Sequence, residues 1–372
     1  MKKRLLIFHP ALAPYRLDQF NDLSVLYDVE VVFLFENLSD NKFDQNKLSS
    51  QLKCRYSFLL KGISHKNRVF RFGVLKKIKQ FKPDIIWGYE YSFTTQYLLL
   101  LKKLGILKQK LGSTIDDNIE MCYSKHSTLH SLARKYTVKQ LDYTIVLSET
   151  VADYYHKTFS IRQSNIIISP ILQNEQRLRK NKKELEDISA KYLKQYRLKG
   201  KKVLLYVGRF VSVKALPDFI KNISSIFQTE EDLRIILIGE GNEKPNIQKI
   251  IDEYAISDKI LLPGRYEGNE LYAWYLCASG FVLPSISEPF GAVVNEALIF
   301  GLNVFCSCYA GVAVLINSDN GVIFDPLKSD ETKEKFMQFL NLMPLVDNPD
   351  LEQKKSLMED YQERFVKEWA KM

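Results

Sequence analysis

The sequence predicts an α/β protein made of two Rossmann-like domains, each a doubly wound parallel sheet. Short apolar runs that suit buried strands alternate along the chain with segments in which apolar residues recur at helical spacing. The length of 372 residues is too great for one ordinary core and suits two domains.

This alternation is clearest in the first half of the chain. The predicted strands there cover residues 4–8, 29–35, 85–88, 110–115, 143–148 and 166–169. Helical patterns cover residues 16–26, 74–81, 92–104 and 129–141. Parallel strands need long crossover connections such as these helices, so residues 1–172 are predicted to form the first domain.

A change in composition marks the end of that domain. Residues 173–200 begin with a polar, charged stretch and continue with a helical pattern, which together indicate a linker with a leading helix. The second domain is predicted over residues 201–349. Residues 350–372 carry charged and aromatic residues at helical spacing and predict a C-terminal helix.

Two glutamates eight positions apart, Glu288 and Glu296, flank a predicted junction between a strand and a helix. Pro289 and Gly291 break the chain before helical spacing resumes over residues 292–301. The first amides of a helix have no intrahelical partners and lie at its positive end, where phosphate binds if no bulky side chain intervenes. Gly291 removes that bulk, and the two carboxylates suit different parts of one elongated polyol.

Two cations further upstream favour a ligand that contains phosphate. A buried-type strand ends at Gly208, and Arg209 and Lys214 follow it in a loop. Cations at the carboxyl end of a parallel strand can neutralise a diphosphate, and open α/β sheets bind ligands at that end. The alternative is that Glu288 only complements the helix dipole while Glu296 is solvated. The whole pattern predicts a pocket for a sugar nucleotide.

The second half of the chain resembles the family 4 glycosyltransferases, which have the GT-B fold and include enzymes that build bacterial surface polysaccharides. The resemblance spans about 150 residues and implies two Rossmann-like domains that face each other across a cleft, with a C-terminal helix that crosses back onto the first. The matching elements are Tyr206-Val-Gly-Arg-Phe with Lys214, Ile238-Gly239-Glu240-Gly241, Pro263-Gly264-Arg265-Tyr266, residues 283–291 with Glu296, then Gly301, Gly311 and Asn320-Gly321.

The resemblance implies a role for each residue of the donor site. Arg209 and Lys214 hold the diphosphate and stabilise the departing nucleotide, and Glu288 contacts the transferred sugar. Glu296 grips the ribose, and the loop of Arg265 meets the nucleobase. The remaining donor-binding residues that it implies are Gly208, Gly239, Tyr266, Phe290, Gly291, Ala292 and Val293.

Two positions depart from the family's pattern. Ala215 stands where a glycine usually follows the loop lysine, and Pro289 replaces a small residue after the first glutamate. Neither change removes a charge or a required donor, so the departures bear on the choice of donor sugar rather than on activity.

Candidate acceptor-binding residues lie at the ends of two strands of the first half. Tyr15 and Arg16 follow the first strand and resemble a Pro-Tyr-Arg element of some polysaccharide-building relatives; the alternative is a core cap and a solvated first-turn residue. Asp116 stands where many relatives carry a histidine, so it is predicted to orient or deprotonate the acceptor hydroxyl, with Asp117 as second candidate. Helix capping by either aspartate is the alternative.

The positive charge of the chain belongs to its first half. Residues 1–180 carry a net charge of +13, whereas residues 181–372 carry −4. Lysines mix with apolar residues over 61–82 and 97–110, a composition that can seat a helix on an anionic membrane or equally describe an ordinary amphipathic helix. Nucleic-acid binding is disfavoured because no reader motif accompanies the charge.

No metal or cofactor is predicted. Arg209 and Lys214 already supply positive charge, and the Asp-x-Asp metal element belongs to glycosyltransferases of another fold. Five cysteines are an odd number without paired metal spacing, which indicates reduced thiols in a cytoplasmic protein. No apolar run approaches the roughly 20 residues that span a bilayer, so the protein is not expected to be integral. The basic first half leads us to expect a peripheral position on the inner face of the cell membrane.

These observations predict a retaining, metal-independent glycosyltransferase of the EC 2.4 class. Its donor is a nucleotide diphosphate sugar of the UDP or GDP type, and its acceptor is a hydroxyl of a growing, lipid-linked surface glycan such as capsule, lipopolysaccharide or exopolysaccharide. The alternatives are a sugar-nucleotide 2-epimerase of the same fold and a catalytically silent membrane-bound scaffold.

Overall fold

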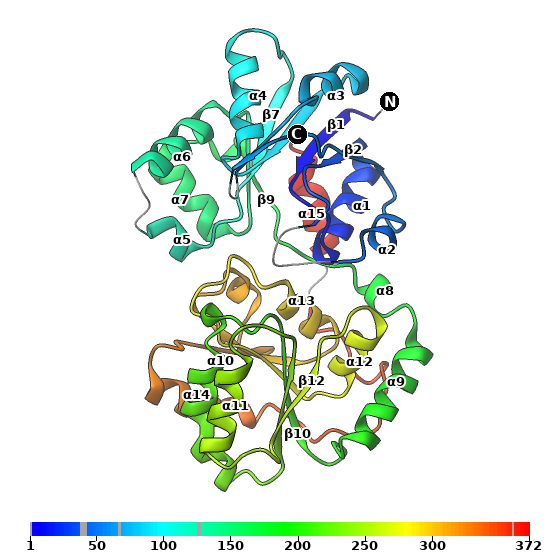
Figure 1. Cartoon of the computed structure of the whole chain (residues 1–372), viewed down its shortest axis with the longest axis vertical. Coiled ribbons are helices and arrows are strands. Elements are labelled where there is room, and N and C mark those ends of the chain that lie inside the picture. Colours follow the sequence, from blue (N-terminus) through cyan, green and yellow to red (C-terminus); the bar gives the residue numbers. More distant parts are fainter. Residues whose placement is uncertain (1, 38–42, 66–67, 125–127, 359–360) are drawn as a thin grey trace. The chain divides into compact units, whose positions relative to one another are not determined.

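Two parallel sheets, one in each of two units, organise the chain (Figure 1). The structure is a computed structural model that describes residues 2–37, 43–65, 68–124, 128–358 and 361–372. Unit 1 contains Met1–Gln173 and Asp360–Met372, and unit 2 contains Asn174–Glu359. The predicted α/β fold with two doubly wound parallel sheets is confirmed.

Unit 1 is built on a seven-stranded parallel sheet in the order β3-β2-β1-β6-β7-β8-β9. The strands are β1 (Arg4–His9), β2 (Asp28–Phe33), β3 (Arg55–Phe58), β6 (Ile85–Tyr89), β7 (Lys110–Thr114), β8 (Tyr143–Val146) and β9 (Ile166–Ile168). The helices are η1 (Pro14–Arg16), α1 (Leu17–Leu26), α2 (Gln45–Ser49), α3 (Val74–Phe81), α4 (Phe93–Lys103), α5 (Ile119–Tyr123), α6 (Thr128–Gln140), α7 (Glu149–Phe159), η2 (Gln163–Asn165) and α15 (Tyr361–Trp369).

The sheet of unit 1 is apolar on both faces because alternate side chains of each strand point to opposite sides. Leu5 and Ile7 belong to the cluster that also contains Phe20 of α1 and Trp369 of α15. Leu6 belongs to a second cluster, formed with residues of α3 and α4. The sheet therefore separates two cores, and Figure 1 shows α15, in red, beside α1, in blue.

Unit 2 carries a six-stranded parallel sheet in the order β12-β11-β10-β13-β14-β15. The strands are β10 (Lys202–Val207), β11 (Leu233–Ile238), β12 (Ile260–Gly264), β13 (Gly280–Leu283), β14 (Asn303–Ser307) and β15 (Gly321–Phe324). The helices are α8 (Glu175–Leu178), α9 (Lys182–Gln195), η3 (Ser212–Lys214), α10 (Leu216–Ile223), η4 (Ser224–Gln228), α11 (Lys244–Glu253), α12 (Asn269–Leu276), α13 (Ala292–Ile299), η5 (Gly311–Leu315) and α14 (Ser329–Leu340).

Each sheet contains one point at which the strand order reverses. In unit 1 it lies between β1 and β6, and in unit 2 between β10 and β13. The loops that leave two such strands run to opposite sides of the sheet, which opens a crevice at their carboxyl ends where open α/β sheets bind ligands. The predicted site residues follow these strands or their neighbours.

The basic stretch over residues 61–82 differs from the single amphipathic segment that the sequence suggested. An antiparallel hairpin, β4 (Gly62–His65) with β5 (Arg68–Arg71), occupies its first part, and residues 66–67 lie outside the described residues. Only Val74–Phe81 is helical, and its apolar residues are buried in the core. For α3, the interpretation as an ordinary amphipathic helix is therefore correct.

The C-terminal segment is helical over Tyr361–Trp369 rather than throughout residues 350–372, and residues 359–360 lie outside the described residues. Trp369 is fully buried in unit 1, with its ring 4.6 Å from that of Trp87. The carbonyl oxygen of Trp369 accepts a hydrogen bond from the Tyr27 hydroxyl at 2.6 Å. The last helix is therefore part of the core of unit 1.

Candidate functional site

In unit 2, the three predicted catalytic residues lie on the loops that follow β10 and β13. Gly208, Arg209 and Lys214 follow β10, and Glu288 follows β13. The two loops are tied together because the Ile286 amide donates to the Val213 carbonyl oxygen at 2.9 Å. Residues more than seventy positions apart are thereby gathered at the reversal of strand order.

Lys214 and Glu288 form an ion pair at the centre of this group. Their side chains are only 15% and 14% exposed, so the charges are largely removed from water. Burial raises the pKa of the Tyr206 hydroxyl, the Glu288 carboxylate raises it further, and the Arg209 guanidinium opposes that rise. Arg209 and Glu288 therefore act on the same tyrosine, and the three predicted catalytic residues of unit 2 share one neighbourhood.

Ala215, the first departure from the family's pattern, adopts a backbone conformation that suits glycine. Its φ is 49° and its ψ is 31°, which is the left-handed helical region, and its side chain is 5% exposed. An L-residue with a Cβ atom is strained in that region. The glycine usual at this position thus has a conformational reason, and the alanine keeps the conformation under strain.

Gly239, on the loop after β11, allows a close approach between two loops. A Cβ atom at this position would lie 1.9 Å from the Gly208 carbonyl oxygen, a distance that no real side chain allows. The Phe210 amide donates to the Glu240 carbonyl oxygen at 2.9 Å across the same contact. Gly239 therefore lets the loop after β11 pack closely against the loop that carries Arg209. Direct contact of Gly239 with a ligand stays a prediction.

Gly291 has a different structural reason from the one expected. Its φ is 99°, and a Cβ atom there would lie 2.8 Å from Leu283 and 3.1 Å from Val312. The missing side chain would thus point into the protein rather than toward a phosphate. Gly291 precedes α13, whose first residues Ala292 and Val293 are partly exposed. The glycine is needed for the turn that presents these amides.

Glu296 is buried, with 7% of its surface exposed, rather than a solvated helix residue. It accepts a hydrogen bond from the Tyr275 hydroxyl at 2.7 Å. Burial, followed by the Glu296 carboxylate, raises the pKa of Tyr275, which keeps this hydroxyl protonated as a donor. One oxygen of Glu296 is thus fixed by the fold, and contact of this carboxylate with a ribose stays a prediction. Phe290, 1% exposed, packs inside the protein.

The loop expected to meet the nucleobase follows β12. Arg265 forms an ion pair with Glu267. The Tyr266 ring packs edge-on against Tyr192 at 5.8 Å and against Trp274 at 5.7 Å. The side chain of Tyr266 is therefore engaged by α9 and α12, and contact of this loop with a nucleobase stays a prediction.

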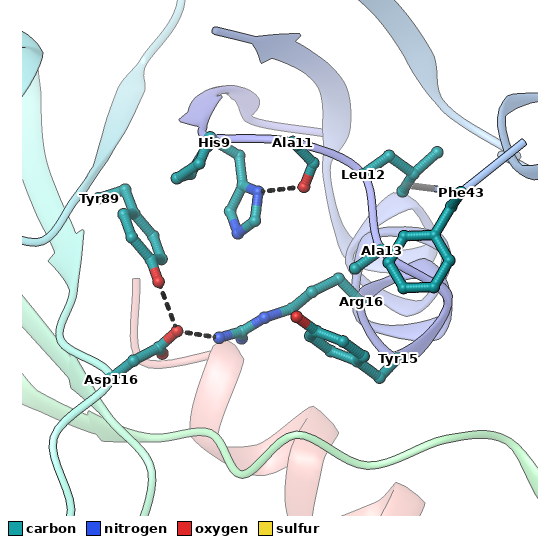
Figure 2. Close-up of a pocket in the computed structure, with 10 residues that line it drawn as sticks. His9, Ala11, Leu12, Ala13, Tyr15, Arg16, Phe43, Tyr89 and Asp116 are labelled. Atoms are coloured by element: carbon teal, nitrogen blue, oxygen red, sulfur yellow. Dashed lines mark hydrogen bonds and ion pairs between the residues drawn. The ribbon is translucent and has the colours of Figure 1, made fainter. Parts of the chain in front are cut away.

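Unit 1 has a pocket of its own at the reversal of strand order, shown in Figure 2. The pocket measures about 430 Å³ with its open mouth included. The loops after β1, β2 and β7 and the end of β6 contribute to it. Its lining residues are His9, Pro10, Ala11, Leu12, Ala13, Tyr15, Arg16, Phe43, Tyr89 and Asp116. The predicted acceptor residues Tyr15, Arg16 and Asp116 are thus brought together.

Asp116 is held through one of its two carboxylate oxygens. Arg16 Nη2 donates to Asp116 Oδ2 at 2.5 Å, and the Tyr89 hydroxyl donates to the same atom at 2.8 Å (Figure 2). The other oxygen, Oδ1, is buried and has no hydrogen-bond partner among the described residues. A carboxylate fixed at one oxygen and open at the other can accept a proton or a hydrogen bond from a bound hydroxyl.

Arg16 is buried, with 2% of its surface exposed, so its interpretation as a solvated first-turn residue is wrong. Arg16 Nη1 donates to Gln19 Oε1 at 2.9 Å. Burial would lower the pKa of the guanidinium, but the Asp116 carboxylate outweighs that effect and raises it. Arg16 therefore remains charged and holds Asp116 in place.

Asp117 belongs to a different cluster from Asp116. It forms an ion pair with Arg134, and it accepts a hydrogen bond from the Tyr155 hydroxyl at 2.6 Å. Asp117 is 5% exposed and is not among the residues that line the pocket. The two adjacent aspartates thus have separate partners, and an acceptor-binding role for Asp117 stays a prediction.

Sequence reasoning missed His9, Tyr89 and Glu90. Glu90 has a left-handed φ of 52°, and its Oε1 accepts the Asp116 amide at 3.1 Å. Burial raises the pKa of Glu90 to about 8, and the charges of Asp116 and Asp117 add to the rise. Tyr89 and Glu90 directly follow the predicted strand 85–88 at the same edge of the sheet, which is the signal that could have identified them.

Within the described residues, no three potential ligands among histidine, cysteine, aspartate and glutamate gather into a metal site. None of the described helices has both the length and the apolar composition that crossing a bilayer requires.

Comparison with known proteins finds similar sequences and similar structures. Residues 189–355 match the family described as glycosyl transferases group 1. Over 338 residues the chain is 24% identical to an uncharacterized glycosyltransferase of Haemophilus influenzae, which covers 88% of this chain and 84% of that protein.

Two solved structures share the fold along the whole chain. Anabaena Alr3699/HepE, in complex with UDP, has a TM-score of 0.70 at 14% identity and covers 100% of both chains. WaaG, a glycosyltransferase involved in lipopolysaccharide biosynthesis, has a TM-score of 0.66 at 14% identity and covers 98% of each chain. The predicted GT-B fold is confirmed by these similarities.

Proposed function

Since this chain belongs to the glycosyl transferases group 1 family, we propose that its acceptor is a lipid-linked surface glycan. The enzymes of this family are retaining and metal-independent, and they take the sugar from a nucleotide-sugar donor. The donor sugar is transferred to a hydroxyl of that growing glycan. Front-face attack by the hydroxyl, on the side from which the diphosphate leaves, retains the configuration of the sugar. The similarity to WaaG supports a surface glycan, and the similarity to HepE supports a UDP donor.

The observation that carries the donor half of the proposal is the largely shielded ion pair of Lys214 with Glu288 beside Arg209. A diphosphate competes with Glu288 for the Lys214 ammonium, so donor binding frees the carboxylate to accept hydrogen bonds from sugar hydroxyls. Arg209 and Lys214 then stabilise the charge that develops on the leaving diphosphate. The buried charges are thus rearranged by the substrate itself.

The remaining predicted residues surround that centre. Glu296, whose carboxylate also accepts the Tyr275 hydroxyl, binds the ribose. The amides of residues 290–293 contact the sugar or the phosphate, and the loop of Arg265 and Tyr266 contacts the base. Gly208 and Gly239 shape the loop that carries Arg209.

On the acceptor side, Asp116 orients the attacking hydroxyl and takes up its proton through Oδ1. Arg16 and Tyr89 hold the opposite oxygen, and Tyr15 lines the same pocket. Asp117 contributes through Arg134 and Tyr155, as support for the loop after β7.

A thermal-shift screen against UDP, GDP, ADP and CMP tests the donor site. We expect one diphosphate to raise the melting temperature of the wild type and to lose that effect in Glu296→Ala. Lys249→Ala, an exposed lysine of α11, is the matched control and should respond like the wild type. No shift with any nucleotide would favour a silent scaffold, and release of free epimerised sugar without an acceptor would favour an epimerase.

A lipid-linked acceptor is supported by one surface of unit 1, which we call the basic apolar surface. Its members are Ile63, Phe72, Leu100, Leu104 and Ile106, each more than half exposed, with the exposed lysines Lys61, Lys103 and Lys108. The Phe70 ring lies 5.4 Å from that of Tyr97, which joins the hairpin to α4. Apolar side chains among cations suit an anionic lipid surface, which is the inner face of the cell membrane in this proposal.

Vesicle co-sedimentation tests that surface. We expect binding to vesicles that contain phosphatidylglycerol, weaker binding to phosphatidylcholine alone, and a decrease with added salt. Ile106→Asp should reduce the bound fraction, whereas Val25→Asp, a matched change at a 66% exposed position of α1, should not. Equal binding by both variants would remove the basic apolar surface from the proposal.

A further inference from the structure

His9 is the last residue of β1 and is held rigidly beside the pocket of unit 1. Only 9% of its surface is exposed. Its ring packs edge-on against Phe20 at 5.3 Å and against Tyr89 at 5.0 Å, between ring centroids. Aromatic neighbours on two sides fix the plane of the imidazole, so its nitrogen atoms have defined directions.

The neighbours of His9 also determine which nitrogen carries a proton. Nδ1 lies 3.0 Å from the Ala11 carbonyl oxygen, and a carbonyl can only accept, so Nδ1 is the donor. Burial, and then the Arg16 charge, lower the pKa of His9 to about 3, which keeps the ring neutral at physiological pH. Nε2 therefore presents a lone pair and acts as a hydrogen-bond acceptor.

Two buried acceptors thus border one pocket. Neither His9 Nε2 nor Asp116 Oδ1 has a hydrogen-bond partner among the described residues. Figure 2 shows the imidazole between the Ala11 carbonyl and the Asp116–Arg16 pair, with its second nitrogen turned away from Ala11. A buried polar atom without a partner is unfavourable, so both atoms favour a ligand that brings hydrogen-bond donors.

The charge balance of the pocket defines the class of that ligand. An anion would face two lone pairs. An ammonium group gains little from Asp116, because the Arg16 guanidinium 2.5 Å away already neutralises the carboxylate. Neutral hydroxyl groups remain as the suitable donors. The apolar wall of Ala11, Leu12 and Phe43 suits the C–H face of a sugar ring.

We propose that this pocket binds two hydroxyl groups of a neutral polyol. One hydroxyl donates a hydrogen bond to Asp116 Oδ1, and the other donates to His9 Nε2. The inference rests on the proposed function, in which the first hydroxyl is the one that attacks the donor sugar. His9 then selects acceptors that carry a second free hydroxyl beside the reacting one. It discriminates against acceptors in which that position is deoxygenated, phosphorylated or oxidised to a carboxylate.

The protonation of His9 can be measured without any substrate. We expect ¹⁵N-histidine NMR of the full chain at neutral pH to show an unprotonated Nε2, assigned with His9→Gln. Methyl glucoside, galactoside and mannoside are then titrated, with glucuronate and glucosamine as charged counterparts. We expect a saturable shift of the Nε2 signal with at least one neutral glycoside and none with the charged sugars. A protonated Nε2, or no saturable shift with any neutral glycoside, would overturn the inference.

Kinetics give a second and independent readout. His9→Phe keeps the aromatic packing but removes the acceptor, and we expect it to raise the KM for an octyl glycoside acceptor about tenfold. The KM for the nucleotide sugar should change less than twofold, and His9→Gln should recover part of the loss because its amide oxygen can accept. An unchanged acceptor KM in a folded His9→Phe would overturn the role of His9.

The two levels of the proposal can fail separately. A wild type that transfers sugar to no octyl glycoside, yet shows the saturable Nε2 shift, supports the hydroxyl-reading pocket and counts against the proposed transfer. Octyl glycosides that lack one hydroxyl group are the second set of acceptors. If the wild type transfers sugar to these deoxy acceptors as well as to the parent glycoside, the inference is overturned and the proposed function stands.

Discussion

Arg16 and Asp116 stand one hundred residues apart in the sequence and form a buried ion pair, with Arg16 Nη2 2.5 Å from Asp116 Oδ2. The pair joins the loop after β1 to the loop after β7, across the intervening strand β6. The contribution of the pair to stability can be separated from its proposed function, because both side chains are largely removed from water while only Asp116 is proposed to react.

The single variant Arg16→Leu should be less stable than the double variant that carries both Arg16→Leu and Asp116→Leu. The wild type and the single variant Asp116→Leu complete the set of four proteins. The single change leaves a buried carboxylate without its cation and should cost about 3–5 kcal/mol in the free energy of unfolding. The double change removes both charges and should recover most of that loss. Urea unfolding of the four proteins measures the coupling, and strictly additive effects would show that the ion pair contributes nothing.

Glu288→Gln should separate donor binding from turnover. The amide keeps the shape of the side chain but no longer attracts Lys214, so we expect UDP to bind as tightly as to the wild type or more tightly. Sugar transfer should fall by about 10²–10³, the range seen when one stabilising group is removed. Calorimetric titration with UDP and initial rates give the two values.

Lys214→Ala is the partner experiment. It should weaken UDP binding and reduce turnover together, because the cation itself is lost. If Glu288→Gln weakened UDP binding as much as Lys214→Ala does, the competition between carboxylate and diphosphate would be refuted.

Ala215→Gly should stabilise unit 2 because it relieves the left-handed strain at φ 49°. We expect an increase of about 0.5–1 kcal/mol, or roughly 1–4 °C in melting temperature. Ala255→Gly is the matched control: that residue has a φ of 53° outside the donor loops and should be stabilised to a similar degree. Only Ala215→Gly should alter the relative rates with different donor sugars. A lower melting temperature for both variants would contradict the assignment of strain.

Glu90→Gln should remove a pH dependence of stability. The folded chain holds the Glu90 proton up to a pKa of about 8, whereas the ordinary value is 4.5, so the unfolded chain releases this proton first. Stability therefore falls as pH rises through that window. We expect the variant to melt several degrees above the wild type at pH 9 and close to it at pH 4. Equal melting temperatures at pH 9 would show that Glu90 titrates normally.

The parallel strands were predictable because they are short apolar runs bounded by polar residues. Arg55–Phe58 escaped prediction because it is a short edge strand with no fully buried residue and with a mixture of polar and aromatic side chains. The hairpin of β4 and β5 escaped because mixed basic and apolar residues fit a strand as well as a helix. By contrast, β9 is also an edge strand but is mostly buried and apolar, and it was predicted.

The donor loop and the acceptor pocket differ in how far the sequence revealed them. Arg209, Lys214 and Glu288 were found because each lies within a short motif. The partners of Asp116 depend on which strands become neighbours, and Tyr89, Glu90 and His9 carry no motif of their own. Pairings set by sheet order cannot be read from local spacing.

The burial of Trp369 beside Trp87 also determines the order in which the protein can mature on the ribosome. Nascent chains fold from their N-terminal end, yet the core of unit 1 includes a helix that is synthesised after all of unit 2. At about 5–20 residues per second, some 200 residues must be added first, a delay on the order of ten to forty seconds. Unit 2 can therefore finish folding while Trp87 of unit 1 still lacks the packing of Trp369.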